Sequence, residues 1–303
     1  MIWFATLVSA SSAFGQTSIY VTDTTGWNAW MKPDGTIMQD AINDQQTGQG
    51  ADDFAGDTTY AAFAQKAGLI NGTTDGILFQ TRMNSYQANG LAGYITLGMD
   101  LDGNGSIDIM MGIDAKSATK NIKFATAGNG ANTSPNTTTW GNFAGGVNLT
   151  TSTYNYAQAG TGALGGTPDA LVTFGISFAD LQTGIRTYAG PAFANFTMSY
   201  TSTIAFVAWT TTQQKSINQD MMGYNGKGYE KDTTTYTDLG AITPPMDAYG
   251  KVPEPATFVQ LGLLLLGGSA LMLRRRNVRA KQVSPVASQV APESTGKLDT
   301  VNR

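Results

Sequence analysis

The chain has 303 residues and contains neither cysteine nor histidine. Disulfides, thiolate nucleophiles, Ser-His-Asp catalysis and histidine-ligated metals are therefore excluded, whereas carboxylate-only chemistry such as glycoside hydrolysis remains possible. Residues 16–252 carry 11 basic and 19 acidic side chains, a net charge of −8, which argues against nucleic acid as a partner.

The chain begins with an apolar run, residues 1–15, that ends in small residues. Ala13 and Gly15 occupy the −3 and −1 positions of a cleavage site before Gln16, which predicts a signal peptide. The basic residues expected at its start are missing, and a start codon further upstream would explain that. The alternative is a buried first strand.

Residues 16–239 form the predicted exported domain. Only 13% of the chain is charged and 36 residues are glycine, a composition that favours short strands joined by many turns. We predict an all-β fold, an antiparallel, jelly-roll-like β-sandwich, with one short helix over residues 179–185. Strand-like patterns recur over residues 77–83, 94–99, 107–113, 121–125, 170–178, 193–200 and 203–210.

One motif in this domain has the spacing of a calcium-binding loop. Oxygen-bearing side chains recur at Asp100, Asp102, Asn104, Ser106 and Asp108, with Gly105 at the sixth position. Side chains two residues apart in a tight loop converge on one point, and the carbonyl of Ser106 would add another oxygen. Position 12 of the pattern is Met111, and the flanks alternate like strands. We therefore predict a structural Ca²⁺ site capping a β-hairpin; the alternative is a plain Asx/Gly turn.

Two further features of this domain carry weaker predictions. The segments 218–223 and 224–228 are Asx/Gly turns, one of which could form a second cation site. The tryptophans are expected mainly as core residues, whereas an exposed row of Trp140, Tyr154 and Tyr156 would indicate a carbohydrate-binding platform.

From Gly240 the sequence changes character. Residues 240–255 hold four of the ten prolines, and we predict a linker. Residues 256–273 are uncharged and apolar, and as a helix of about 27 Å they would just span a bilayer. Arg274, Arg275 and Arg276 follow and would stop the helix on the cytoplasmic side. The remaining residues, 277–303, are polar and predicted to be disordered.

The order of these parts, Val252, Pro253, Glu254 and Pro255, then one membrane span, then the arginine cluster, resembles the PEP-CTERM sorting tail recognised by exosortases. The match covers residues 252–276. The resemblance implies anchoring in the inner membrane, cleavage near Pro-Glu-Pro by an exosortase-like protease, and transfer of the body to the cell surface or extracellular matrix. Tails of this family usually end soon after the basic cluster, whereas this chain continues. The alternative is an ordinary single-pass anchor.

The sequence thus favours a non-catalytic exported surface or matrix protein stabilised by Ca²⁺. Two other functions stay open. A carbohydrate-binding module acting on exopolysaccharide would need exposed aromatic side chains. A carboxylate-based glycoside hydrolase would need two acids facing each other across a cleft, and Glu230 is the single glutamate of residues 16–252.

Overall fold

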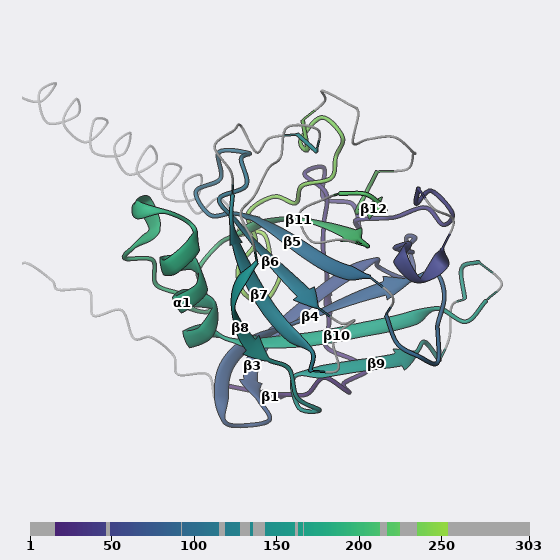
Figure 1. The fold of residues 1–303 in the computed structure, drawn as a ribbon, viewed down its shortest axis with the longest axis horizontal. Coiled ribbons are helices and arrows are strands. Elements are labelled where there is room, and N and C mark those ends of the chain that lie inside the picture. Colours follow the sequence, from purple (N-terminus) through teal and green to yellow (C-terminus); the bar gives the residue numbers. More distant parts are fainter. Residues whose placement is uncertain are drawn as a thin grey trace, which may run out of the picture. The chain divides into compact units, whose positions relative to one another are not determined.

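The computed structural model describes residues 16–46, 49–91, 93–114, 119–127, 134–135, 143–160, 163–165, 167–212, 217–224 and 235–253. The chain divides into two units, residues 1–253 and residues 254–303. The first unit is built mainly of β-strands (Figure 1).

The first sheet has the strand order β1-β3-β4-β10-β9, with β2 also paired to β3. Its strands are β1 (Ser18–Ile19), β2 (Asn28–Ala29), β3 (Phe63–Ile70), β4 (Thr74–Met83), β9 (Tyr154–Gln158) and β10 (Ala170–Ser177). The β1–β3 pairing is parallel and the others are antiparallel.

The second sheet is antiparallel, with the order β12-β11-β5-β6-β7-β8. Its strands are β5 (Tyr94–Asp100), β6 (Ile109–Asp114), β7 (Asn121–Thr126), β8 (Ala144–Asn148), β11 (Ala205–Thr211) and β12 (Asp220–Met221). Strands β5 to β8 follow one another as a meander, whereas a jelly roll is built from two Greek keys. The all-β prediction is confirmed, but the strand order differs from the jelly-roll-like one, because alternation reveals strands and not their neighbours.

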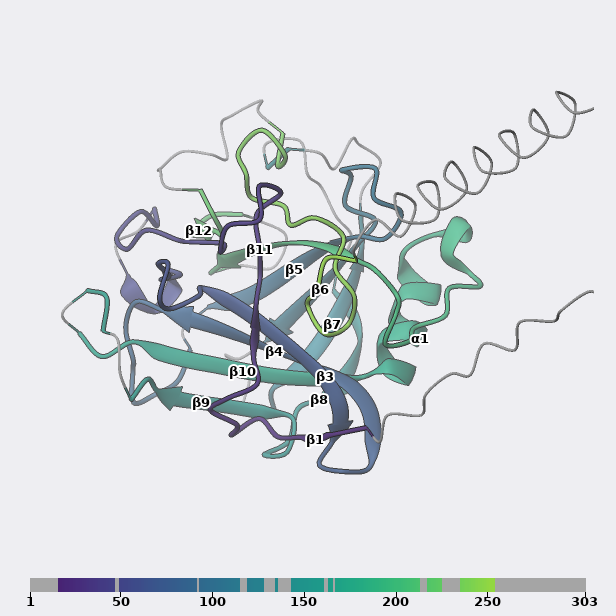
Figure 2. The same cartoon turned by 180° about the vertical axis from the view of Figure 1, so that it is seen from behind.

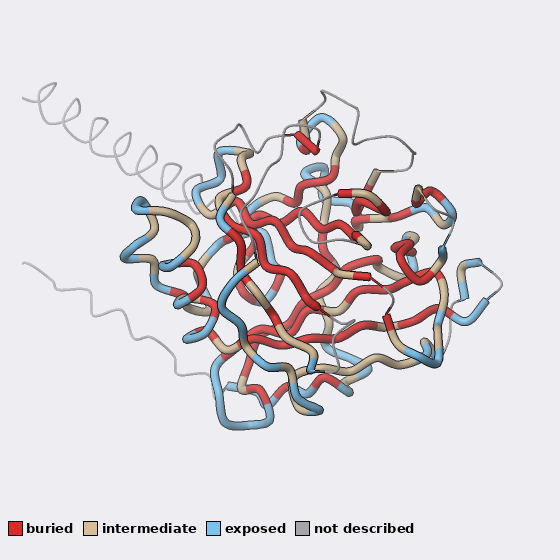
Figure 3. The backbone as a smooth tube through the Cα atoms, viewed as in Figure 1, coloured by how far each residue is buried: buried red, intermediate tan, exposed pale blue. Residues whose placement is uncertain are grey.

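One hydrophobic core lies between the two sheets (Figure 3). From the second sheet it receives Ile95, Leu97 and Met99, which the alternation placed on one face of β5. From the first sheet it receives Phe79 and Phe174, whose rings stack 5.4 Å apart. A strand with one face in a core must keep its register, because a slip of one residue would turn its apolar side chains outward.

The outer face of the second sheet is also buried, under the C-terminal part of the unit. Met110, Val207 and Trp209 of this face form a second apolar cluster with Tyr236 and Ile242. The backbone joins the sheet here too, because Thr243 N–H donates to the carbonyl of Phe206 (2.9 Å). We call residues 235–250 the C-terminal cover.

The cover corrects the predicted linker. Ala241, Ile242, Met246 and Ala248 are buried, so the folded unit does not end at residue 239. The prolines of this stretch suggested a stalk, but the apolar residues between them have an apolar sheet face to pack against. Lys251, Val252 and Pro253, which follow the cover, are all exposed.

Helix α1 (Phe178–Tyr188) packs Phe178, Leu181 and Ile185 against the core. It starts one residue before the predicted 179–185 range and ends three residues later. Ser177 caps it, since its Oγ accepts a hydrogen bond from the amide of Asp180 (3.0 Å). A short 3₁₀ helix, η1 (Gly50–Asp52), precedes β3.

The strand predicted over residues 193–200 is not formed. Instead the chain makes the 3₁₀ helix η2 (Pro191–Phe193) and a series of turns. Phe193 and Phe196 pack against the core without joining a ladder, and the amide of Phe196 donates to the carbonyl of Phe193 (2.9 Å). The apolar residues of this segment contact the edge of the core from turns, and in the sequence their spacing resembles the alternation of a strand.

The predicted signal peptide (1–15), Glu254 and Pro255, the membrane span (256–273) and the tail (274–303) lie outside the described residues. Within the part of the chain that the structure describes, no helix combines the length and the apolar character that crossing a membrane requires.

Candidate functional site

The predicted calcium loop joins two adjacent strands of the second sheet. Strand β5 ends at Asp100 and β6 begins at Ile109, with Met99 paired to Ile109 and Tyr94 to Asp114. The prediction that the loop caps a hairpin is therefore confirmed. Asp114 lies at the opposite end of the hairpin, where its carboxylate is 3.4 Å from Lys123 Nζ.

The carboxylate of Asp100 organises this loop. Its Oδ1 accepts from the amides of Gly103 (2.7 Å) and Asn104 (3.2 Å), and its Oδ2 accepts from the amide of Gly105 (2.7 Å). Both glycines have positive φ, 76° and 82°, a conformation that glycine adopts without the Cβ clash of other residues. The loop backbone is thus folded around one buried acid.

Three of the five predicted ligands come together. Asp100, Asp102 and Asp108 each place one carboxylate oxygen within 4.8 Å of the others. The Oδ1 of Asn104 instead accepts from the amide of Ser106 (2.7 Å). Ligand roles for Asn104 and for the carbonyl of Ser106 stay predictions.

One of these acids has a shifted pKa. Burial raises the pKa of Asp108 to about 6, and the nearby charges of Asp102 and Asp100 raise it too, against a hydrogen bond from the amide of Leu101. A cation among the three carboxylates would relieve this repulsion. The hydrogen bonds alone would equally suit a plain turn, so the calcium remains a prediction.

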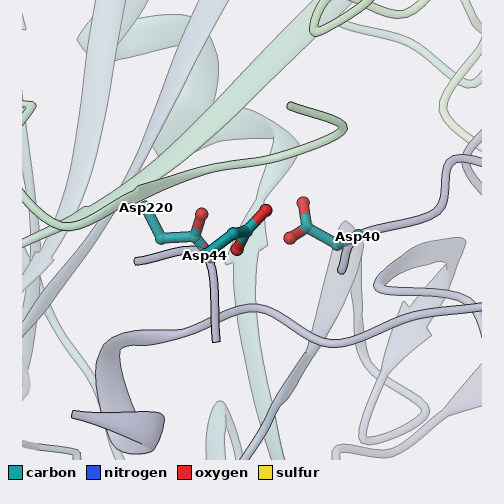
Figure 4. A group of neighbouring side chains, drawn as sticks. All are labelled: Asp40, Asp44 and Asp220. Carbon is teal, nitrogen blue, oxygen red and sulfur yellow. The ribbon is translucent and has the colours of Figure 1, made fainter. Parts of the chain in front are cut away.

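A second acidic cluster is assembled from distant parts of the chain. Asp40, Asp44 and Asp220 also bring carboxylate oxygens within 4.8 Å of one another (Figure 4). Asp220 lies in segment 218–223, for which the sequence indicated a possible second cation site. No pattern in the sequence pointed to Asp40 or Asp44 as ligands. Only tertiary contacts unite them.

A polar hollow of about 500 Å³ lies on the outer face of the first sheet. Gln80, Thr173 and Asn155 line it from β4, β10 and β9, where they are register neighbours, and residues 21–24 line another side. Figure 2 shows this N-terminal segment, in purple, running across the strands. The hollow offers amide and hydroxyl groups to a polar ligand.

Two of the three aromatic residues whose exposure would indicate a carbohydrate-binding platform are not exposed. Tyr154 and Tyr156 are half-buried and pack against the core, and the hydroxyl of Tyr156 accepts from the amide of Gln87 (2.9 Å). Trp140 lies outside the described residues. Trp30 and Trp209 are fully buried, which confirms the prediction of core tryptophans at those positions.

Three of the hollows that described residues line contain one carboxylate each. These are Asp23 in the polar hollow, Asp247 in a narrow hollow between the cover and the core, and Asp180 beside α1. The grouped acids Asp40 and Asp220 are buried. A hydrolase of the predicted kind needs two acids facing a bound substrate, and these three hollows do not bring two acids together.

Comparisons of the chain with protein-family models, with curated proteins and with solved structures gave no match.

Proposed function

We propose that this protein is a non-catalytic surface or matrix protein, exported at its N-terminus and sorted through its C-terminal tail. The observation that carries the proposal is the sequence order of Val252 to Pro255, one apolar span, and Arg274 to Arg276. An arginine cluster cannot cross the bilayer cheaply, so the folded unit would be outside.

The position of the folded unit supports processing at the sorting motif. The unit extends to Pro253, and Val252 is 46% exposed. The last buried side chains, Met246 and Ala248, come before it. A protease acting near Pro-Glu-Pro would therefore find Lys251 to Pro253 exposed and would release a body whose buried side chains are retained.

A structural role for calcium belongs to the same proposal. Extracellular calcium modules bind weakly, with dissociation constants of roughly 10⁻⁴–10⁻³ M. The three carboxylate oxygens that the loop from Asp100 to Asp108 brings within 4.8 Å of one another support a site of this kind. The ion would hold the β5–β6 hairpin together and would not act as a signal.

A carbohydrate-binding role is the second candidate. The polar hollow favours it, because amide and hydroxyl side chains such as Gln80, Asn155 and Thr173 suit the hydroxyl groups of a glycan. An exopolysaccharide would be the ligand. The half-buried Tyr154 and Tyr156 argue for a hydrogen-bonded rather than a stacked mode of binding.

The sorting proposal is tested by changing the motif in the natural host. In a variant with Pro253, Glu254 and Pro255 replaced by alanine, the protein should stay in the inner membrane with its C-terminus intact. Pro245→Ala, at an exposed proline of the cover, is the matched control and should be released like the wild type. Equal release of the motif variant and the control would contradict sorting through Pro-Glu-Pro. Fractionation with antibodies to the body and to the tail measures both.

A further inference from the structure

Three buried acids meet where the N-terminal and C-terminal parts of the unit touch. Asp40 lies in an isolated bridge with Gly56, Asp44 follows four residues later, and Asp220 begins β12. Their exposed fractions are 2%, 8% and 1%. Figure 4 shows the three carboxyl groups turned toward one another.

In the described part of the chain, one carboxylate oxygen of Asp40 has no hydrogen bond. Asp220 accepts from the amides of Phe54 (2.6 Å) and Met221 (2.7 Å). Asp40 Oδ2 accepts from the amide of Gly223 (2.6 Å), but its Oδ1 has no hydrogen-bond partner among the described residues. A buried carboxylate oxygen without a partner is costly and is seldom left in that state.

One more side-chain oxygen, on the neighbour of Asp44 in the chain, is also buried without a hydrogen-bond partner among the described residues. The side-chain oxygen of Gln45, which follows Asp44 in the chain, has no hydrogen-bond partner within the described part of the chain, although Gln45 is 1% exposed. Neutral amide oxygens are common ligands of hard cations.

The surroundings add negative charge. The basic side chains that form ion pairs among the described residues are paired with acids outside this cluster. The pairs are Lys66–Asp23, Arg82–Asp169 and Lys123–Asp114. Asp53, fully buried, adds a fourth carboxyl group nearby, and burial together with the charges of Asp220, Asp44 and Asp53 raises the pKa of Asp40 well above its usual range.

We propose that Asp40, Asp44 and Asp220 bind a Ca²⁺ ion at a buried site separate from the β5–β6 loop. Two oxygens on opposite sides of one Ca²⁺ stand about 4.6–5.2 Å apart, because each lies about 2.3–2.6 Å from the ion. The three carboxylate oxygens lie within 4.8 Å of one another, close enough for one ion of this size to contact all three. Mg²⁺ usually keeps several waters and binds through one or two carboxylates, which suits a buried cluster of three acids less well.

Such an ion would tie two remote parts of the fold. Asp40 and Asp44 belong to the segment before β3, whereas Asp220 leads into β12 and the C-terminal cover. The site goes beyond the proposed sorting function and does not depend on it. The alternative is a metal-free cluster whose carboxyl groups share protons.

The test uses the full-length chain carrying Asp102→Ala, so that the loop site is disabled. Calorimetric titration with Ca²⁺ at pH 7.5 should still find one site per chain. The melting temperature should rise by about 5–10 °C at a Ca²⁺ concentration 100 times the dissociation constant. Adding Asp40→Asn should weaken binding at least tenfold, while Asp34→Asn, at an exposed position of the same segment, should leave it unchanged.

Three results would overturn the site. The first is an Asp102→Ala chain that binds no Ca²⁺ at 10 mM and melts at the same temperature in chelator. The second is equal binding by the Asp40→Asn and Asp34→Asn chains, and the third is saturation by Mg²⁺ but not by Ca²⁺. If Asp40→Asn fails to fold, the first and third measurements still decide, because they need no change in the cluster.

Discussion

At the residue scale, the acids of the β5–β6 loop divide into two kinds. Asp100 is buried and accepts three backbone hydrogen bonds, whereas Asp102 is exposed and accepts one, from the amide of Asn104 (3.1 Å). Asp100 thus has a structural role whether or not a metal binds. The carboxylate of Asp102 contributes little to the structure of the loop unless an ion is bound.

This difference predicts distinct effects of alanine substitutions. Asp100→Ala should lower the free energy of unfolding by about 2–4 kcal/mol even in chelator, because three amides lose a charged acceptor. Asp102→Ala should cost less than about 0.5 kcal/mol in chelator, but should remove the stabilisation that we expect from Ca²⁺ binding at the loop. Urea denaturation with and without Ca²⁺ measures both. Equal losses for the two variants in chelator would contradict this division of roles.

The raised pKa of Asp108 predicts a pH dependence. Because the pKa is about 6 in the folded state and about 3.9 when unfolded, the folded state binds the proton more tightly. In chelator, this residue's contribution to stability is therefore fully present below about pH 4 and is lost as the pH rises to about 6.

The measurement is the melting temperature between pH 4 and 7 in chelator, compared for the wild type and Asp108→Asn. Asn does not titrate, so the variant should lose less stability than the wild type as the pH rises. The buried acids Asp40 and Asp220 contribute a slope of the same sign to both chains. Parallel curves for the two proteins would refute the assignment to Asp108.

The loop could be predicted from the sequence because its acids lie within nine consecutive residues, so that local geometry alone brings them together. The cluster of Asp40, Asp44 and Asp220 could not, because its members meet only through the packing of the finished fold. The sequence of residues 218–223 indicated a possible cation site, but it could not predict which other acids would lie near Asp220.

At the element scale, strands with clean alternation were predictable. Strands β4, β5, β6, β7, β10 and β11 each overlap a predicted segment, because one apolar face enters the core. Strand β3 was missed, since it carries Gln65 and Lys66. Both polar side chains are paired in the structure. The side-chain oxygen of Gln65 accepts a hydrogen bond from Trp30 Nε1 (2.8 Å). Lys66 forms an ion pair with Asp23 (2.6 Å) and lies over the Trp27 ring.

The C-terminal cover yields an element-scale prediction. Ile242 is 5% exposed and packs in the second apolar cluster, so Ile242→Ala should lower the free energy of unfolding by about 2–4 kcal/mol. Val252→Ala, at an exposed position ten residues later, is the control and should change it by less than about 0.5 kcal/mol. Urea denaturation compares the two. A neutral Ile242→Ala would mean that residues 240–250 behave as a linker after all.

At the scale of the whole molecule, the body builds its core without disulfides, since the chain has no cysteine. Two sheets enclose one core, and the cover buries the outer face of the second sheet. Composition predicted the all-β class, but it could not reveal the cover, because a segment with several prolines resembles a linker until its apolar partner surface is known. The first unit ends at Pro253, within the predicted sorting motif.

The most direct test of the proposed function is the intact mass of the protein released from the surface of its natural host. We expect a body that begins at Gln16 and ends within residues 252–255, without the apolar span and the arginine cluster. Recovery of a soluble cytoplasmic chain that retains both Met1 and Arg303 would contradict export and sorting alike.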